Sequence, residues 1–403
     1  MDLLHQIEQQ FTDHVNSLFS SQTQFNISPE YQLNTDISKQ QFGDITTNIA
    51  LILSKQLKQT PRALAQKLVE RFQHKDIAKI EVAGAGFINF FLKAEAWQNL
   101  LQDLALKGKG FFTLEPTAAR YSYSIEFVSA NPTGPLHIGH GRGGIIGDVL
   151  GNILRFIGHH VTKEFYINDA GSQIKKLGNS LKIRYLELLN FNVMIPEDGY
   201  QGEYLREIAQ DLVTEYGNAL IEKSDTFFED YAKDILLAKI KHTLALYGIN
   251  YDVWFSEKSL HDTNAVQKAL DVLKANGYIY TQDNASWFET TKFGDDKDRV
   301  VRKSSGELTY VASDIAYIEN KLGRGANRLL YILGQDHHSY VVRLKAIMQA
   351  LGHSPEALDV ILYQLVTVKE TGAVLRLSKR AGRIVTLQDI IDTVGIDVAR
   401  FFY

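Results

Sequence analysis

Two histidines in the segment Ala130-Asn-Pro-Thr-Gly-Pro-Leu-His-Ile-Gly-His140 could take part in phosphate chemistry. His137 and His140 are three residues apart at the predicted start of a helix over 138–157, so their rings project from one side of its first turn. The backbone N–H groups and partial positive charge of a helix N-terminus suit a polyphosphate. Two histidines there can donate hydrogen bonds to phosphate oxygens as charge builds up in a transition state. The segment therefore predicts a polyphosphate site.

Glycines are dense in the same segment, at Gly139, Gly141, Gly143, Gly144 and Gly147. A glycine inside a helix costs about 1 kcal/mol, so this density needs a compensating reason. We interpret these positions as places where a flat ring or a phosphate approaches the helix. The alternative is a capped helix that packs closely on a sheet, with incidental histidines.

Three of these glycines also fit a different nucleotide motif. Gly139-x-Gly141-x-x-Gly144 matches the dinucleotide fingerprint, and Glu164 follows at the spacing that this motif asks for. In that motif the first glycine ends the strand itself. Here ten residues separate Val128 from Gly139, two of them prolines. The sequence therefore disfavours a nicotinamide or flavin enzyme.

A second candidate is the basic run Arg376-Leu-Ser-Lys-Arg380, within a stretch over 369–383 where five cations accompany one carboxylate. Gly372 and Gly382 flank this run as hinges. Lys379 on a mobile loop could close over a pyrophosphate leaving group. The alternative is a solvated basic loop, the usual explanation for such a run.

The elements that would position these residues form a β-turn-α-β succession. A strand over 123–127, the helix over 138–157 and a strand over 161–166 begin a parallel doubly wound sheet. Helical patterns predict an insertion over about 175–290 between the halves of the sheet. Strand-like runs that supply the second half are expected at 308–311, 329–333 and 360–366.

The chain divides into four predicted parts. Residues 1–95 read as a small α+β domain with three helical stretches and a hairpin, and 96–118 read as a linker because of their Gly and Pro content. Residues 119–385 form the sheet domain. Residues 386–403 begin a helical stem, whose three consecutive aromatic residues suggest that the chain has been cut before its natural end.

Composition limits the function classes. The 403 residues are 45% hydrophobic and 22% charged, as in an ordinary globular protein. The lack of cysteine excludes disulfides, iron–sulfur clusters, thiol nucleophiles and cysteine zinc sites, and the histidine pairs lack zinc spacing. A net charge of −4 means that any nucleic-acid contact needs a local basic patch. Without a signal or membrane-spanning segment, we expect a cytoplasmic protein.

Together, the two clusters His137–His140 and Leu377–Arg380 resemble the paired ATP signatures of class I aminoacyl-tRNA synthetases. The chain is most similar to the arginyl-tRNA synthetase family. Further segments resemble motifs of that family in the family's order, the first of them at the end of its N-terminal domain: Gly84-Ala-Gly-Phe-Ile-Asn89, Glu126-Phe-Val-Ser-Ala-Asn131, Asn168-Asp-Ala-Gly171, Tyr310-Val-Ala-Ser-Asp314 and Gly334-Gln-Asp-His337.

The resemblance implies a Rossmann-like catalytic domain with a helical insertion, preceded by a tRNA-contacting α+β domain. It assigns catalysis to His137, His140 and Lys379. It assigns ATP binding to Pro135, His137, Gly139, His140, Gly141, Ser378, Lys379 and Arg380, and arginine binding to Glu126, Asn131, Tyr310, Asp314 and Gln335.

The arginine assignment agrees with the chemistry of a guanidinium. This group is planar and always charged, so a selective site needs carboxylates that accept paired N–H bonds. Glu126 and Asp314 supply two, at strand ends where doubly wound sheets bind ligands. Tyr310 lies on the same face as Asp314 if a helix starts there. The alternative for a buried Glu126 or Asp314 is a structural ion pair with an arginine of the chain.

The implied activity is the ATP-dependent ligation of L-arginine to tRNA-Arg through an arginyl-adenylate. Mg²⁺-bound ATP is then a substrate, no prosthetic group or zinc is needed, and the partners are tRNA-Arg, arginine and ATP, with no membrane. We expect a monomer.

The chain departs from the family pattern in two places. Gly134 and Leu136 stand where many members carry a lysine before the first histidine, which leaves Lys379 as the phosphate lysine. We expect these 403 residues to lack the family's helical anticodon-binding domain and to show little activity alone. Two other functions compete: a nucleotidylyltransferase that acts on a small metabolite without RNA, and a non-catalytic RNA-binding fragment.

Overall fold

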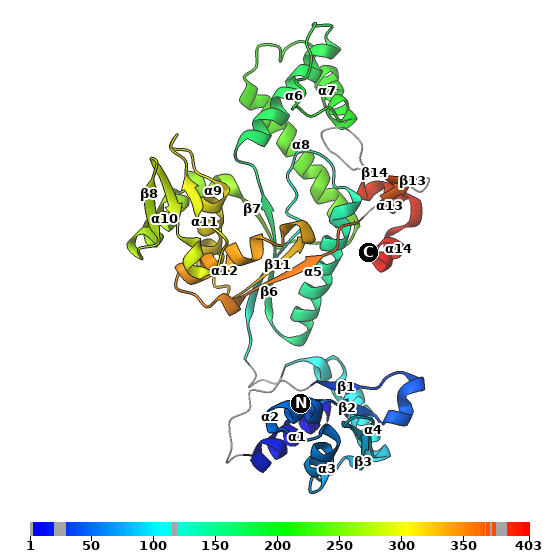
Figure 1. Ribbon diagram of the computed structural model, residues 1–403. Helices are drawn as coiled ribbons and strands as arrows, with labels where there is room; N and C mark the ends of the chain where they lie inside the picture. The colour runs from blue at the N-terminus through cyan, green and yellow to red at the C-terminus, as the bar shows by residue number, and fades with distance from the viewer. Residues whose placement is uncertain (1–2, 20–29, 115–118, 367, 371–372, 376–384) are drawn as a thin grey trace. The chain divides into compact units, whose positions relative to one another are not determined.

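The computed structural model describes residues 3–19, 30–114, 119–366, 368–370, 373–375 and 385–403 (Figure 1). The chain forms two compact units, Met1–Ala118 and Ala119–Tyr403. Each unit has its own hydrophobic core. No helix within the described ranges is long and apolar enough to cross a membrane.

The first unit packs helices against a four-stranded antiparallel sheet. Helix α1 buries Ile7, Phe11 and Val15, one on each successive turn, against Phe72 and Phe90. The strands lie in the order β1-β2-β4-β3. The elements are α1 (Leu3–Phe19), β1 (Tyr31–Leu33), β2 (Ile45–Thr47), α2 (Ile49–Leu57), α3 (Pro61–Val69), β3 (Ile77–Ala83), β4 (Phe87–Leu92) and α4 (Ala94–Lys107).

Helix α4 occupies much of the range 96–118, for which the sequence predicted a linker. The prediction gave weight to Gly108 and Gly110, whereas the preceding residues through Lys107 are good helix formers. Gly108, at φ 53°, caps the C-terminus of α4. The glycines therefore end a helix and do not mark a linker that begins at residue 96.

The second unit is built on a five-stranded parallel sheet in the order β12-β11-β5-β6-β7. Its central strands are buried on both faces, as parallel strands are. Leu329 and Tyr331 of β11 pack on one side, and Leu330 and Ile332 pack on the other. The strands are β5 (Ser122–Phe127), β6 (His160–Ile167), β7 (Val253–Ser256), β11 (Arg328–Gly334) and β12 (Leu358–Tyr363). This is the Rossmann-like sheet that the sequence predicted.

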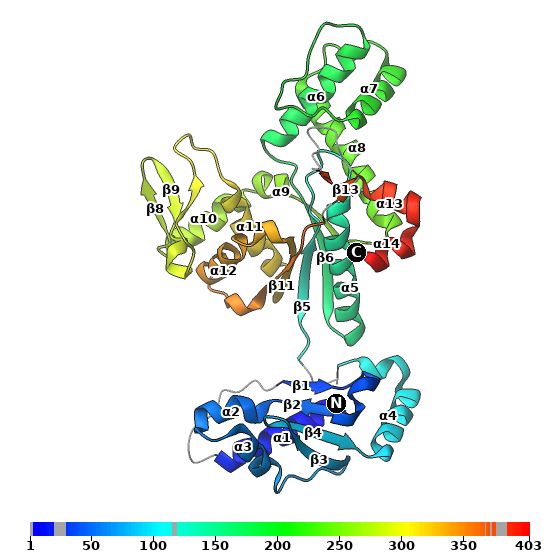
Figure 2. The ribbon, with the colours of Figure 1, turned by 45° about the vertical axis from the view of Figure 1, so that its right-hand side comes forward.

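Helices cover both faces of this sheet (Figure 2). Helix α5 (Ile138–Ile157) packs on one face, and α13 (Leu387–Val394) and α14 (Ile396–Phe402) lie beside it in both views. On the other face lie α9 (Glu257–Asp262), α10 (Ala265–Ala275), α11 (Tyr310–Gly323) and α12 (Tyr340–Ala350). Phe401 and Phe402 of α14 are 82% and 78% exposed.

The predicted insertion over 175–290 consists of two different parts. Helices α6 (Ser172–Leu188), α7 (Glu203–Tyr216) and α8 (Asp225–Leu246) form a bundle with its own core. Strand β7 then rejoins the sheet, so the helical insertion ends before 253. Beyond α9 and α10, the short strands β8 (Ile279–Gln282), β9 (Ala285–Phe288) and β10 (Arg299–Arg302) pair antiparallel, in a region where the sequence analysis found no strand pattern.

The strand predicted at 308–311 is wrong. Leu308 makes only an isolated bridge to Arg302, and helix α11 begins at Tyr310. Thr309 is the extended N-cap residue, and the apolar residues after it recur with helical spacing at Val311, Ile315 and Ile318, all of them buried. The short apolar run at 308–311 was therefore too brief to separate a strand from a helix.

Four of the five glycines singled out in the sequence, Gly141, Gly143, Gly144 and Gly147, lie against other parts of the protein, which is the close packing that the sequence left open as the alternative. A Cβ at Gly147 would lie 2.2 Å from the Phe127 ring, and a Cβ at Gly143 would lie 2.6 Å from the Tyr363 ring. The flat rings that approach the helix belong to β5 and β12. The glycines let α5 lie close to the sheet, so the starting turn of α5 is held at the carboxyl ends of the strands.

We expect Gly147→Ala to lower the free energy of unfolding by about 2 kcal/mol, because the new methyl group must displace the Phe127 ring. Chemical denaturation followed by circular dichroism measures this difference. The matched control is Val149→Ala on the exposed side of the same helix, with an expected change within about 0.5 kcal/mol. Equal stability of Gly147→Ala and the wild-type protein would contradict the packing argument.

Candidate active site

The first turn of α5 holds the two histidine rings together. His137 is the N-cap residue, and its Nδ1 accepts a hydrogen bond from the Gly139 N–H at 3.1 Å. The Nδ1 of His140 accepts from the His137 N–H at 3.1 Å, which closes a capping box made of two histidines. The rings stack with centroids 3.7 Å apart. Because each Nδ1 accepts a hydrogen bond, the neutral rings carry their proton on Nε2, a hydrogen-bond donor.

The other residues assigned to ATP in this segment lie around the same turn. Pro135 is half-buried just before it, and Gly139 lies against the His137 ring. Gly141 is buried, and a Cβ there would meet the side chains of Leu387 and Tyr403. Gly141 therefore faces α13 and the end of the chain, so its lack of a side chain serves packing as at Gly143.

Both described flanks of the basic segment are attached to this part of α5. On the C-terminal flank, the Ile138 N–H donates to the Val385 carbonyl at 3.0 Å and the Leu387 N–H donates to the Leu136 carbonyl at 2.9 Å. On the N-terminal flank, the guanidinium of Arg142 donates to the Gln364 carbonyl at 2.7 Å. Ser378, Lys379 and Arg380 lie outside the described residues. That their segment meets the histidines stays a prediction from the sequence.

A cavity of about 340 Å³ opens at the carboxyl ends of β5, β6 and β11. Four of the five residues assigned to arginine line it: Glu126, Asn131, Tyr310 and Asp314. Gln335 is exposed on the turn after β11 and does not line the cavity, although His337 of that turn does. The structure therefore brings four predicted residues together and leaves the fifth at the edge.

Glu126 ends inside this cavity with both carboxylate oxygens hydrogen-bonded. Its Oε2 accepts from the Lys321 ammonium at 2.6 Å, and its Oε1 accepts from the Ser129 hydroxyl at 3.1 Å. The chain reaches Ser129 through positive φ angles, 67° at Val128 and 38° at Ser129. A β-branched residue rarely adopts this conformation, and such strain is typical of functional sites. The turn after β5 thus holds a strained geometry that places a hydroxyl on Glu126.

Asp314 is the opposite case, a half-buried carboxylate that lines the cavity and is incompletely paired. Its Oδ2 has no hydrogen-bond partner among the described residues, and neither has Nε of nearby Arg343. Burial raises the pKa of Asp314 to about 7, and the carboxylates of Glu126 and Glu257 add to the rise. The Tyr340 hydroxyl and Arg343 offset it in part. An unpaired buried acceptor beside an open cavity is a strong point for binding a cation.

Asp314 lies in the first turn of α11 and not at a strand end as the sequence analysis expected. The expectation that a helix places Tyr310 and Asp314 on one face is correct, because both line the cavity. Tyr310 is 60% exposed at the mouth. Its ring is therefore available to lie against a planar ligand.

The sequence analysis missed several residues that line this cavity. Glu257 is 4% exposed and follows β7 directly, where burial raises the pKa of its carboxyl. The rule that ligands bind beyond the carboxyl ends of parallel strands would have pointed to it, had β7 been recognised as a sheet strand. Other missed lining residues are Tyr166, Tyr331, Tyr340 and Arg343.

Comparison with known protein families identifies the family of the whole chain. Residues 114–400 match the model of the class I (R) tRNA synthetase catalytic domain, and residues 5–92 match the model of the arginyl-tRNA synthetase N-terminal domain. The chain belongs to the arginyl-tRNA synthetase family. Its fold is therefore the class I catalytic domain preceded by a small N-terminal domain.

Curated relatives of the chain are named arginine–tRNA ligase. The arginine–tRNA ligase of Citrifermentans bemidjiense is 45% identical over 367 residues, which cover 90% of this chain and 66% of the relative. That of Geobacillus thermodenitrificans is 43% identical with the same coverage. The chain thus spans about two thirds of the length of these relatives.

Solved structures agree with the fold. A Campylobacter jejuni structure that bears the name arginyl-tRNA synthetase has a TM-score of 0.69 and 37% identity, and covers 77% of this chain and 68% of its own. The arginyl-tRNA synthetase of Thermus thermophilus has a TM-score of 0.69 at 17% identity, and covers 99% of this chain and 73% of its own. The second likeness concerns the fold alone.

We expect Asp314→Asn to raise the free energy of unfolding at pH 8 by about 1–2 kcal/mol. The native pKa of about 7 exceeds the unfolded value of 3.8, so the native state binds more protons and the wild-type protein loses stability as pH rises across this window. Denaturation at several pH values between 4 and 8 measures the effect.

The asparagine variant should lose less stability than the wild-type protein across the same range. The control is Asp230→Asn, an exposed position on α8, which should leave the pH profile unchanged. A variant that is no more stable than the wild-type protein at pH 8 would show that Asp314 is not a strained carboxylate.

Proposed function

We propose that this chain carries the catalytic centre of an arginine–tRNA ligase, which joins L-arginine to tRNA-Arg through an arginyl-adenylate. One observation carries the proposal. The cavity holds the incompletely paired Asp314 and the ion-paired Glu126, and a short turn connects it to two stacked histidines at the start of a helix. One part suits a guanidinium and the other suits a polyphosphate. Relatives named arginine–tRNA ligase support the pairing.

In this proposal the guanidinium of arginine pairs with Asp314 and Glu126, and the Tyr310 ring lies against its face. Asn131, whose amide donates to Gln173 at 3.0 Å, and Gln335 fix the amino acid's backbone. The turn after β5 leads from Asn131 directly to His137, so the substrate carboxylate would face the first turn of α5. The cavity thus orients arginine by its charged end and presents the carboxylate to the nucleotide.

ATP, carried as its Mg²⁺ complex, is the second substrate. A carboxylate oxygen of arginine attacks the α-phosphorus in line, the bond from this phosphorus to the bridging oxygen breaks, and pyrophosphate leaves with that electron pair. The Nε2 protons of His137 and His140 and the ammonium of Lys379 stabilise the charge that builds up on phosphate oxygens. No protein nucleophile is required, because positioning and charge stabilisation suffice.

In the second step a terminal ribose hydroxyl of tRNA-Arg attacks the arginyl carbonyl and AMP leaves. The N-terminal unit, which matches the arginyl-tRNA synthetase N-terminal domain model, is proposed to contact the tRNA. We propose that the enzyme acts as a cytoplasmic monomer with no bound metal beyond the Mg²⁺ of its substrate. The alternative function, a nucleotidylyltransferase that acts on a small metabolite, is not supported, because the relatives and structures reported above are named as arginine–tRNA ligases or arginyl-tRNA synthetases.

We expect arginine binding to tighten about tenfold between pH 6 and pH 8. A carboxyl with a pKa of about 7 must lose its proton to pair with the guanidinium, so affinity rises as pH rises through this value. Isothermal titration calorimetry measures the dissociation constant. Citrulline, the uncharged isostere, should bind weakly at both pH values. A dissociation constant independent of pH would contradict the role of Asp314.

We expect pyrophosphate exchange in the presence of tRNA-Arg to depend on arginine and to be lost in Lys379→Ala, since the ammonium would stabilise the leaving group. Filter binding should show that the same variant keeps nearly its full affinity for tRNA. If lysine or glutamine supported exchange as well as arginine, the substrate assignment would be wrong. Unchanged exchange in Lys379→Ala would favour a different phosphate ligand.

A further inference from the structure

Lys321 is a buried cation that the proposed reaction does not use. It lies on α11, two turns beyond Asp314, and its side chain is fully buried. Its ammonium donates to Glu126 Oε2 at 2.6 Å and lies over two tyrosine rings, 4.3 Å from the Tyr317 centroid and 4.2 Å from the Tyr331 centroid. A carboxylate and two aromatic faces are strong partners for a cation.

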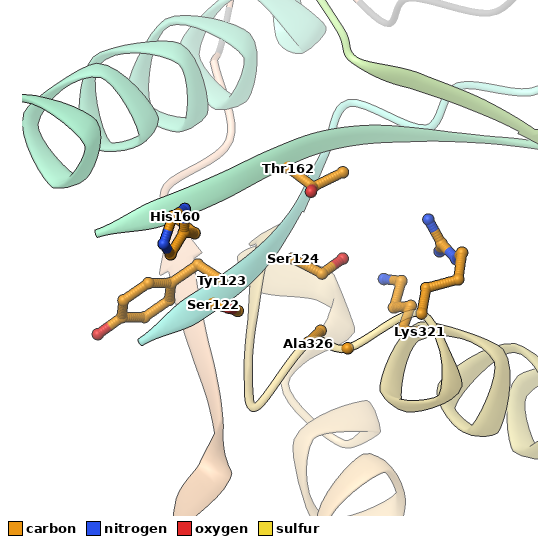
Figure 3. Close-up of a pocket in the computed structure, with 9 residues that line it drawn as sticks. Ser122, Tyr123, Ser124, His160, Thr162, Lys321 and Ala326 are labelled. Atoms are coloured by element: carbon orange, nitrogen blue, oxygen red, sulfur yellow. The ribbon is translucent and has the colours of Figure 1, made fainter. Parts of the chain in front are cut away.

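These partners of Lys321 form the wall of the arginine cavity. Glu126, Tyr317 and Tyr331 line the cavity, whereas Lys321 itself does not. Lys321 instead lines a second, smaller cavity of about 140 Å³, shown in Figure 3, where its side chain points toward the strands that carry Ser124 and Thr162. Lys321 therefore supports the cavity wall from behind.

The smaller cavity lacks the features of a ligand site. Its two buried or half-buried cations already have anionic partners: Lys321 pairs with Glu126, and Arg324 donates to both oxygens of Glu164 at 2.8 and 2.7 Å. Ser124 Oγ has no partner among the described residues, but a lone hydroxyl does not define a ligand. The two ion pairs are therefore the feature of this region that bears on the arginine cavity.

The charges around the arginine cavity give Lys321 a function. Among Asp, Glu, Lys and Arg, the cavity lining holds three carboxylates and one guanidinium, namely those of Glu126, Glu257, Asp314 and Arg343. Lys321 adds one positive charge behind the wall. The whole set then lacks one positive charge, which a single guanidinium supplies. Without Lys321, Glu126 would be a buried carboxylate without a counter-ion, which is strongly unfavourable.

We propose, on the basis of the function proposed above, that Lys321 is a specificity-determining positioning residue: its ammonium is the counter-ion of Glu126 and fixes the orientation of that carboxylate, so that the cavity prefers a guanidinium over its uncharged isostere. Lys321 acts through Glu126 and does not touch the substrate. Ser129 holds the other oxygen of Glu126. Other titratable groups lie close enough to Glu126 to interact with its charge: Asp314, Tyr317 and Tyr340, Tyr331, Tyr166 and Tyr251.

The test is a double-mutant cycle on Lys321 and Glu126. Calorimetry on the whole chain at pH 8 measures the dissociation constants of citrulline and arginine, and their ratio is the arginine preference. Lys321→Met removes the charge at similar length, and we expect it to lower the arginine preference about tenfold or more. In a Glu126→Gln background the same substitution should change the preference less than threefold, because its target is already uncharged. A merely structural lysine would show the same loss in both backgrounds.

Two further variants separate charge from packing. Lys321→Arg keeps the positive charge and should restore most of the arginine preference. Arg324→Met, at the residue that follows α11, breaks the neighbouring ion pair with Glu164, which does not line the arginine cavity, and should lower stability without changing the ratio. If Lys321→Met melts below the assay temperature, Lys321→Gln, which can donate to Glu126 without charge, should show the same loss of preference.

The outcomes distinguish this inference from the function on which it rests. If the wild-type chain binds arginine no better than citrulline, the proposed function is wrong and the inference is wrong with it. If the wild-type chain prefers arginine and the uncharged Lys321 variants keep that preference within threefold, the function stands and Lys321 has no part in specificity. Equal losses in the wild-type and Glu126→Gln backgrounds also overturn the inference.

Discussion

Negative charge buried at the carboxyl edge of a parallel sheet is the constraint on which this site depends. Glu126 and Glu164 are 8% and 0% exposed, and each has a counter-ion, Lys321 of α11 and Arg324 just after it. Asp314 has only partial compensation from Tyr340 and Arg343, and its Oδ2 is left without a partner in the described part of the chain. A folded protein tolerates such a group where a ligand will complete it. The uneven pairing of three carboxylates therefore marks the position that a cationic substrate would take.

The helix that carries the histidines is held in place by the same sheet. Glycines let α5 approach Phe127 of β5 and Tyr363 of β12. Backbone hydrogen bonds join the start of α5 to the C-terminal flank of the basic segment, and the Arg142 side chain donates to Gln364 on the N-terminal flank. The first turn of α5 and the cavity, which we propose as the polyphosphate site and the cation site, thus lie at the carboxyl ends of the same sheet. A change in the packing of α5 would move the histidines relative to the cavity, which is how distant packing affects positioning in catalysis.

Sequence reasoning reached the parts of this arrangement that local pattern determines. The helix over 138–157, the strands beside it and the helical stem that begins at 386 were predicted from the sequence, and four of the five residues assigned to arginine meet in one cavity. Sequence reasoning missed the features that depend on tertiary structure. β7 has four residues, too few for a period, and Lys321 looks like an ordinary helix-surface lysine in a polar stretch. The glycines of α5 were ambiguous because a close ligand and a close ring make the same demand on the sequence.

The most direct test of the account is the number of protons released when arginine binds at pH 7. Calorimetric titration in buffers of different ionisation enthalpy gives this number. The account predicts the release of about half a proton in the wild-type chain, because Asp314 is half-protonated at its pKa of about 7 and must be charged to pair with the guanidinium. Asp314→Asn should release none. Proton uptake in the wild-type chain, or equal release in both proteins, would contradict the claim that this buried carboxylate is completed by the substrate.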